Sequence, residues 1–113
     1  MVHDVRGKGL MIGIEFGEPK SLPLKAGWKV THRANEGLFG QMLSIPLMRD
    51  YGILTQIAGH ARDVHKLAPP LVIGDEEIDT FMAAYEKVVD SLHHFPGPLW
   101  DLGTTLLKNR MNW

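Results

Sequence analysis

The segment LMIGIEF, residues 10–16, decides the fold because its side chains alternate in character along an extended chain. The two faces carry Leu10, Ile12, Ile14 and Phe16 on one side, and Met11, Gly13 and Glu15 on the other. A period of two is typical of a β-strand with one buried face. The preceding RGKG, residues 6–9, contains two glycines, which tolerate positive φ, so the sequence predicts a turn into this strand.

Beyond this strand, the apolar spacing changes to the three and four residues that are typical of a helix. Residues 17–29 come first and show no steady period, so they predict a loop or insertion, with a short helix near Trp28 as the alternative. Between residues 34 and 51 the helical period is carried by Leu38, Phe39, Met42, Leu43, Ile45 and Met48. Pro46 predicts a kink or a division into two helices because proline lacks a backbone donor. Gly52 is expected to end the helix.

A short antiparallel hairpin is predicted next. Ile53–Ile57 and Val64–Ala68 are its strands, and Ala58–Asp63 is the turn between them. Pro69 and Pro70 then end the ladder, since neither residue can donate a backbone hydrogen bond.

The clearest helix follows Gly74. Asp75 is expected to cap its N-terminus, where Glu76 and Glu77 complement the positive end of the helix dipole. The face expected to be buried has a period of about 3.6 and comprises Ile78, Phe81, Met82, Tyr85, Val88, Val89 and Leu92. The motif FPGP, residues 95–98, breaks the chain direction, and residues 99–107 predict one more short helix.

The order of these elements predicts an α+β fold, a small antiparallel sheet of about three strands covered by helices on one face. With 113 residues the chain has the length of one domain, so residues 1–113 are expected to form a single unit. Apolar residues make up 44% and charged residues 22% of the sequence, which is typical of a globular chain.

Charge and cysteine content narrow the expected partners and compartment. The 12 basic and 13 acidic residues give a net charge of −1, so we expect neither nucleic acid nor a membrane surface as partner. No apolar run approaches the roughly 20 residues that span a bilayer, and the start lacks the regions of a signal peptide. The absence of cysteine is compatible with a reducing cytoplasm, where we expect the protein to act.

The sequence does not support a dinucleotide-binding or a metal-binding site. The glycines at 7, 9 and 13 precede or lie within a strand, whereas a dinucleotide fingerprint follows a strand and opens a helix. The six histidines are His3, His32, His60, His65, His93 and His94. No cysteine or H-E-x-x-H pattern accompanies them, so we expect no metal ion. His60 and His65 flank the predicted turn, where capping of backbone groups is favoured over ligand binding.

Lys66 is the charge that stands out, because it lies within the otherwise apolar stretch between Val64 and Leu71. If the strand alternates, Lys66 shares a face with Val64 and Ala68, so its ammonium must reach solvent or meet an anion. Two interpretations stay open: a solvated residue of an edge strand, and a cation that binds an anionic ligand.

Three blocks of sequence together carry a resemblance to a known family. The first is VRGKGLMIGIEF, residues 5–16, the second is GILT, residues 52–55, and the third is VHKLAPPLVI followed by GDEEID, residues 64–79. In this order and spacing they resemble the C-terminal small domain of class III aminotransferases, which are fold-type I enzymes that depend on pyridoxal phosphate.

The resemblance implies a homodimeric transaminase that passes an amino group from an amino acid or ω-amine to a 2-oxo acid. The cofactor acts as the electron sink, while the protein orients the substrate and moves protons. In the family, the Schiff-base lysine and the phosphate-binding loop precede the region that this chain resembles. We therefore assign no catalytic and no cofactor-binding residue here, and pyridoxal phosphate is not expected to be held by this segment alone.

One departure from the family concerns Lys66. Many members have arginine two residues before the A-P-P-L stretch, where it can grip a substrate carboxylate through two parallel hydrogen bonds. Lysine at this position supplies the charge without the planar fork. The resemblance thus makes Lys66 the candidate substrate-binding residue, with a weaker or differently shaped recognition of carboxylate.

Two hypotheses follow for the whole chain. In the first it is the last part of a longer aminotransferase, inactive alone, whose partners are the remainder of the enzyme and a second subunit. In support, a sheet strand is expected almost at Met1, with no room for the segment that should precede it. In the second it is a non-catalytic binding or dimerisation module that retains the fold. Exposed apolar surface favours the first hypothesis, and polar residues in its place favour the second.

Overall fold

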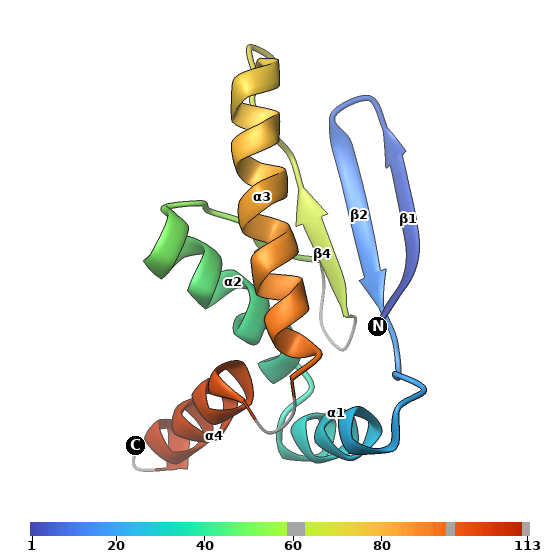
Figure 1. Ribbon diagram of the computed structural model, residues 1–113, viewed down its shortest axis with the longest axis vertical. Coiled ribbons are helices and arrows are strands. Elements are labelled where there is room, and N and C mark those ends of the chain that lie inside the picture. Colours follow the sequence, from blue (N-terminus) through green and yellow to red (C-terminus); the bar gives the residue numbers. More distant parts are fainter. Residues whose placement is uncertain (59–62, 95–96, 112–113) are drawn as a thin grey trace.

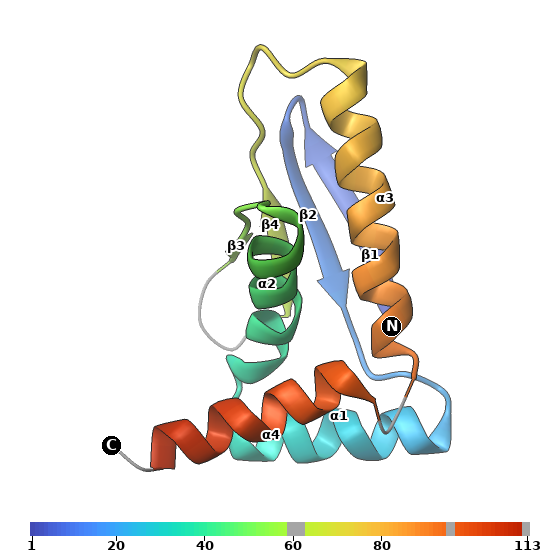
Figure 2. The ribbon, with the colours of Figure 1, turned by 60° about the vertical axis from the view of Figure 1, so that its left-hand side comes forward.

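A computed structural model of the chain describes residues 1–58, 63–94 and 97–111. Within these residues, four strands form one antiparallel sheet in the order β1-β2-β4-β3. Helices α2 and α3 lie along one face of the sheet, and α1 and α4 cross beneath its lower end (Figures 1 and 2). The predicted α+β class is confirmed, with four strands in place of about three.

Strands β1 (Val2–Lys8) and β2 (Met11–Phe16) form a hairpin. The two residues between them include Gly9, whose φ of 59° lies in the left-handed region that residues with a Cβ rarely adopt. The alternation predicted for residues 10–16 is confirmed at its centre, since Ile14 and Phe16 are buried while Met11 is exposed. Strand β1 was not predicted, and it adds the extra strand at the sheet edge.

Helix α1 (Leu22–Ala34) replaces much of the loop or insertion predicted for residues 17–29, so that prediction was wrong. A helix does lie at Trp28, and it is longer than the short helix kept as the alternative. Pro23 lies in the first turn, where its missing N–H costs no helical hydrogen bond. The buried face of the helix consists of Leu24, Gly27, Trp28 and Thr31.

Helix α2 (Leu38–Tyr51) forms the centre of the molecule and ends at Gly52, as predicted, with φ of 67°. Pro46 lies inside it without dividing it into two helices. The proline ring is fully buried, and this packing offsets the hydrogen bond that proline cannot donate. Its core residues are Phe39, Met42, Leu43 and Leu47.

Strands β3 (Gln56–Ile57) and β4 (Val64–Leu67) pair antiparallel, which confirms the predicted hairpin. Residues 59–62 of the predicted turn lie outside the described part of the chain. On its other side β4 pairs with β2, in a register that places Gly13 opposite Lys66 and Ile14 opposite His65. Strand β4 is therefore paired along both edges.

Helix α3 (Asp75–Leu92) has Gly74 as its N-cap, one residue before the cap predicted. The Gly74 N–H donates to Glu77 Oε2 at 3.1 Å, which satisfies one of the free donors at the helix start. The buried face predicted for this helix is correct for Tyr85, Val88 and Leu92. Ile78 and Met82, nearer the N-terminus, are exposed, because this half of α3 extends past α1 and α4 (Figure 1).

Helix α4 (Pro98–Met111) closes the core from below. Trp100 is buried, and its indole N–H donates to the Leu92 carbonyl at 3.1 Å, which anchors α4 to the end of α3. The resulting core joins the covered face of β2 to all four helices described. None of the described helices is long and apolar enough to cross a membrane.

Candidate functional site

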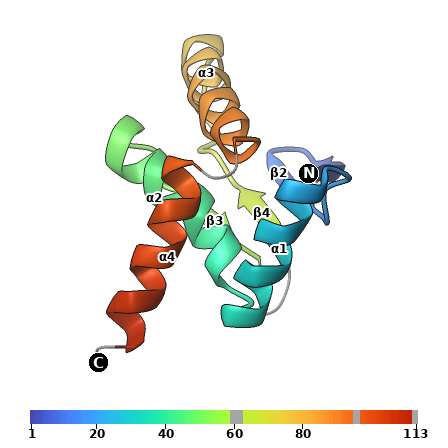
Figure 3. The same ribbon diagram turned by 60° about the horizontal axis from the view of Figure 1, so that its bottom comes forward.

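The two faces of the sheet differ in what covers them. The register places Val5, Ile14, His65 and Ile57 in one row across the four strands, and Ile14 and His65 in that row are buried under the helices. The next row, on the opposite face, consists of Arg6, Gly13, Lys66 and Gln56. Figure 3, which shows the sheet from its lower end, has α2 and α3 on the same side of it. We call the opposite side the open face.

Lys66 lies at the centre of the open face. Its strand is paired on both sides, so the edge-strand interpretation is wrong. The side chain is half-buried and makes no hydrogen bond or ion pair with the part of the chain that the structure describes. Its register partner on the adjacent strand β2 is Gly13, which has no side chain to cover the ammonium. Lys66 is thus a cation that the described residues leave without a counter-charge.

Arg6 forms ion pairs with two carboxylates of the open face, those of Glu15 and Asp4. Its guanidinium lies 2.8 Å from Glu15 Oε2 and 2.9 Å from Asp4 Oδ2, and all three side chains share the open face. Glu15 and then Asp4 raise the pKa of Arg6 through these hydrogen bonds. Glu15 pairs with Val64 in the register, which makes it a diagonal neighbour of Lys66, within the reach of long side chains. Its engagement with Arg6 explains why Lys66 remains unpaired.

His65 is adjacent to Lys66 but points into the core, where it is 2% exposed. Its Nδ1 atom lies 2.9 Å from the Tyr85 hydroxyl, and the two rings stack at 5.5 Å between centroids. Burial lowers the pKa of His65 to about 4 and raises the pKa of Tyr85. His65 is therefore neutral at neutral pH. It neither caps a backbone group among the described residues nor faces the site, so its role is packing.

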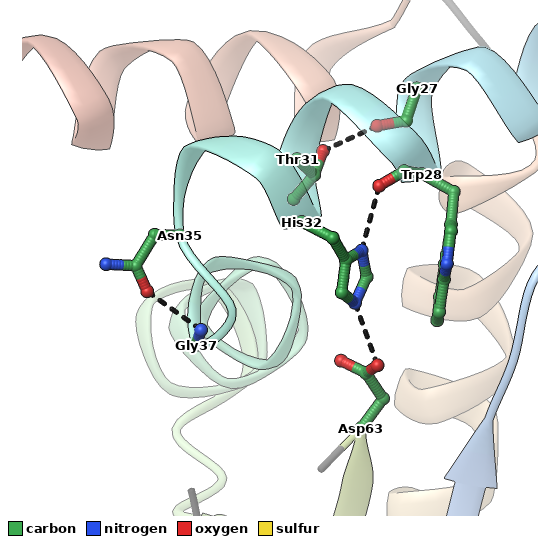
Figure 4. A network of polar contacts seen from close by, with 7 residues as sticks. All are labelled: Gly27, Trp28, Thr31, His32, Asn35, Gly37 and Asp63. Atoms are coloured by element: carbon green, nitrogen blue, oxygen red, sulfur yellow. Dashed lines mark hydrogen bonds and ion pairs between the residues drawn. The ribbon is translucent and has the colours of Figure 1, made fainter. Parts of the chain in front are cut away.

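A third polar arrangement joins α1 to the sheet, and the sequence did not reveal it. His32 bonds the Trp28 carbonyl through Nδ1 and Asp63 Oδ2 through Nε2, each at 2.8 Å (Figure 4). Because 31 residues separate His32 from Asp63, no local pattern signals the pair. The sequence offered one hint of this pair, the polar residue His32 in what proves to be the last turn of α1.

The other histidines do not gather into a site. His3 contacts the Glu18 carbonyl through Nε2, His93 contacts the Val89 carbonyl, and exposed His94 lies 3.7 Å from Asp90. His60 lies outside the described residues. Among the residues described, no three of His, Cys, Asp or Glu are placed to hold a metal ion.

Comparisons with known proteins identify the family of the chain. The family model described as "Aminotransferase class-III" matches residues 1–89. The chain is 35% identical to diaminobutyrate--2-oxoglutarate aminotransferase of Rhizobium meliloti over 91 residues, which cover 77% of this chain and 18% of that protein. It is 31% identical to acetylornithine aminotransferase of Mycobacterium bovis over 90 residues, which cover 80% of this chain and 17% of the relative.

The chain thus spans less than a fifth of the length of these curated relatives. The matched region contains the β1–β2 hairpin, the strand that carries Lys66 and most of α3, and it ends before α4. The four strands that form the described sheet all lie within this matched region. The chain belongs to the class III aminotransferase family.

Proposed function

We propose that this chain acts as the C-terminal part of an enzyme that depends on pyridoxal phosphate and transfers an amino group from an amino acid or ω-amine to a 2-oxo acid. The family and the small share of each relative that the chain covers support this proposal. The cofactor would supply the electron sink for the reaction. The chain itself would contribute a substrate contact and a surface for the rest of the enzyme.

The observation that carries the proposal is the unpaired ammonium of Lys66 on the open face. A half-buried cation is stabilised by an anion, and a substrate carboxylate is the anion that an amino acid and a 2-oxo acid share. Lys66 would bind that carboxylate and orient the substrate. Lysine offers a point charge, so the recognition tolerates more geometries than a bidentate arginine would.

Exposed apolar side chains near the start of α3 support an interface with a partner in that region. Leu71 and Val72, in the connection between β4 and α3, are 91% and 90% exposed, and Ile78 and Met82 follow on the first half of α3. Apolar residues gathered in one region of a surface are typical of an interface. The remainder of the enzyme and a second subunit would cover them. A self-sufficient binding module, our alternative, would be expected to carry polar residues here.

We do not expect the described residues to hold the cofactor by themselves. Pyridoxal phosphate needs a lysine that forms a Schiff base and an acid that faces its pyridine nitrogen. On the open face the carboxylate of Glu15, the diagonal neighbour of Lys66, and that of Asp4 are both bound by Arg6. The cofactor would therefore be held by the remainder of the enzyme, in a reducing cytoplasm compatible with the lack of cysteine.

We expect the 113-residue chain alone to be inactive, because in the family the Schiff-base lysine precedes the region that this chain resembles. Mixing the purified chain with pyridoxal phosphate and several amino donors should give no protein-bound absorbance in the aldimine band. Turnover should not exceed that of the free cofactor. A single lysine that borohydride traps in a stable adduct, together with sustained turnover, would overturn the proposal that the cofactor site lies elsewhere.

A further inference from the structure

His32 connects the end of α1 to the residue that precedes β4. Its Nδ1 lies 2.8 Å from the Trp28 carbonyl oxygen, and its Nε2 lies 2.8 Å from Asp63 Oδ2 (Figure 4). The backbone carbonyl of Asp63 in turn accepts a hydrogen bond from the Phe16 N–H at 2.8 Å. Asp63 therefore ties α1, through its side chain, to β2, through its backbone.

The two partners of His32 determine its protonation state. A carbonyl oxygen and a carboxylate oxygen both accept hydrogen bonds, and neither carries a proton at neutral pH. Each ring nitrogen must then donate, which requires the doubly protonated imidazolium. A neutral imidazole has one N–H, so it would leave one of the two contacts with two lone pairs facing each other. The geometry therefore requires a protonated His32 imidazole between α1 and β4.

The surroundings favour this charge. His32 and Asp63 have side chains that are 24% and 17% exposed, and the imidazole stacks on the Trp28 indole with 4.1 Å between ring centroids. Phe39 of α2 faces the ring at 6.0 Å and carries no charge. The charged groups that act on the ring are Asp63 and, more weakly, Glu36 after α1. The hydrogen bond to Asp63 raises the pKa of His32, against the opposing effect of burial.

We propose that His32 and Asp63 form a proton-dependent clamp between α1 and the start of β4, closed while the imidazole is protonated and loosened when that proton leaves. The sign follows from linkage: a pKa raised in the folded state stabilises the fold fully below the unfolded value of about 6.5. This stabilisation is lost as the pH rises through the folded pKa. The clamp is therefore closed below about pH 6.5 and opens as the pH rises through the raised pKa of His32.

The clamp bears on the candidate site because Asp63 precedes Lys66 by three residues. Releasing Asp63 from His32 frees the start of β4, whose third residue is Lys66. A pH-dependent placement of Lys66 is the consequence for function, and this consequence rests on the proposed carboxylate contact. The clamp itself does not, since it requires neither cofactor nor substrate.

A titration of the 113-residue chain by NMR tests the clamp directly. The ring signals of His32 and the backbone amides of Phe16, Asp63 and Val64 would be followed from about pH 5.5 to about pH 9. We expect the His32 midpoint to lie above the ordinary value of 6.5 and the three amides to shift with the same midpoint. In Asp63→Asn the His32 midpoint should fall, and the shared amide response should disappear.

Asp90→Asn is the matched control, because it removes the carboxylate beside His94, an exposed pair at 3.7 Å that connects no two elements. It should leave the His32 midpoint and the three amides unchanged. If Asp63→Asn does not fold, the wild-type titration still decides. A His32 midpoint at or below the ordinary value, or amides of Phe16, Asp63 and Val64 that do not follow it, would overturn the clamp. No result depends on transamination, so failure of the proposed enzyme would not imitate failure of the clamp.

Discussion

The neighbouring residues His65 and Lys66 lie on opposite faces of the sheet and differ in burial and in their polar contacts. On the covered face, His65 is buried, bonded to Tyr85 and neutral at neutral pH. On the open face, Lys66 is half-buried and has no partner among the described residues. On the covered face His65 bonds Tyr85 through Nδ1 and contributes packing, while its buried Nε2 has no hydrogen-bond partner among the described residues; on the open face Lys66 carries a charge that we propose binds another molecule. Substitutions on the two faces should therefore differ in whether they change folding or recognition.

The largest expected effect separates the faces within a single strand. Ile14→Ala on the covered face of β2 should lower the free energy of unfolding by about 2–4 kcal/mol, since it removes a buried side chain and leaves a cavity in the core. Met11→Ala on the open face of the same strand is the control, because Met11 is 61% exposed. Its effect should stay within about 0.5 kcal/mol. Urea denaturation of each variant, with equal slopes, measures both.

Equal losses for Ile14→Ala and Met11→Ala would contradict the division into faces. Such a result would mean that the open face is covered in the isolated chain, for example by association of two copies. Measuring the sedimentation of both variants would distinguish that outcome.

A smaller effect is expected for recognition. In the enzyme of which this chain would form part, Lys66→Ala should lower kcat/KM for a carboxylate substrate about ten- to a hundredfold, as expected from losing a charge-assisted hydrogen bond of about 1.5–3 kcal/mol. Lys66→Arg should restore much of the activity and can improve it through bidentate geometry. An amine without a carboxylate should respond little. Equal losses with both substrate types would show that Lys66 supports the fold, and unchanged kinetics would show that it is a solvated surface residue.

The sequence predicted the elements whose apolar period matches their burial. The alternation at residues 10–16 placed Ile14 and Phe16 in the core and Met11 outside it, and the structure confirms this. Strand β1 was missed because all seven of its residues are exposed, so neither face imposes an apolar period. The full extent of α1 was missed because its buried positions, Leu24, Gly27, Trp28 and Thr31, have helical spacing but include a glycine and a threonine. Hydrophobicity alone does not reveal such a face.

The candidate site was predictable in part for a related reason. Lys66 is recognisable because a cation interrupts an apolar strand, but its lack of a partner depends on the pairing of Arg6 with Glu15 across a hairpin. The His32–Asp63 pair depends on tertiary docking of a helix whose full extent the sequence did not predict. Contacts between distant residues follow from the packing of whole elements. A local pattern names the residue types but not the pairs that they form.

The smallest expected effect tests how the open face keeps Lys66 available. Arg6→Gln should release Glu15, the diagonal neighbour of Lys66, and let it form an ion pair with the ammonium. This competition should raise KM for a carboxylate substrate roughly twofold to fivefold, the scale of an exposed ion pair, and leave kcat unchanged. Steady-state kinetics of the assembled enzyme, with a carboxylate and a non-carboxylate substrate, would show the split.

Two further variants decide whether Arg6 acts through Glu15. The double substitution Arg6→Gln with Glu15→Gln should return KM to the wild-type value, because the competing carboxylate is gone. Asp4→Asn removes the other partner of Arg6 but leaves the 2.8 Å contact with Glu15, so it should change neither KM nor kcat. If the double variant keeps the raised KM, Arg6 contacts the substrate itself or supports the hairpin. If Arg6→Gln alone has no effect, Glu15 does not compete for Lys66, and the spacing of the two strands suffices to keep the ammonium free.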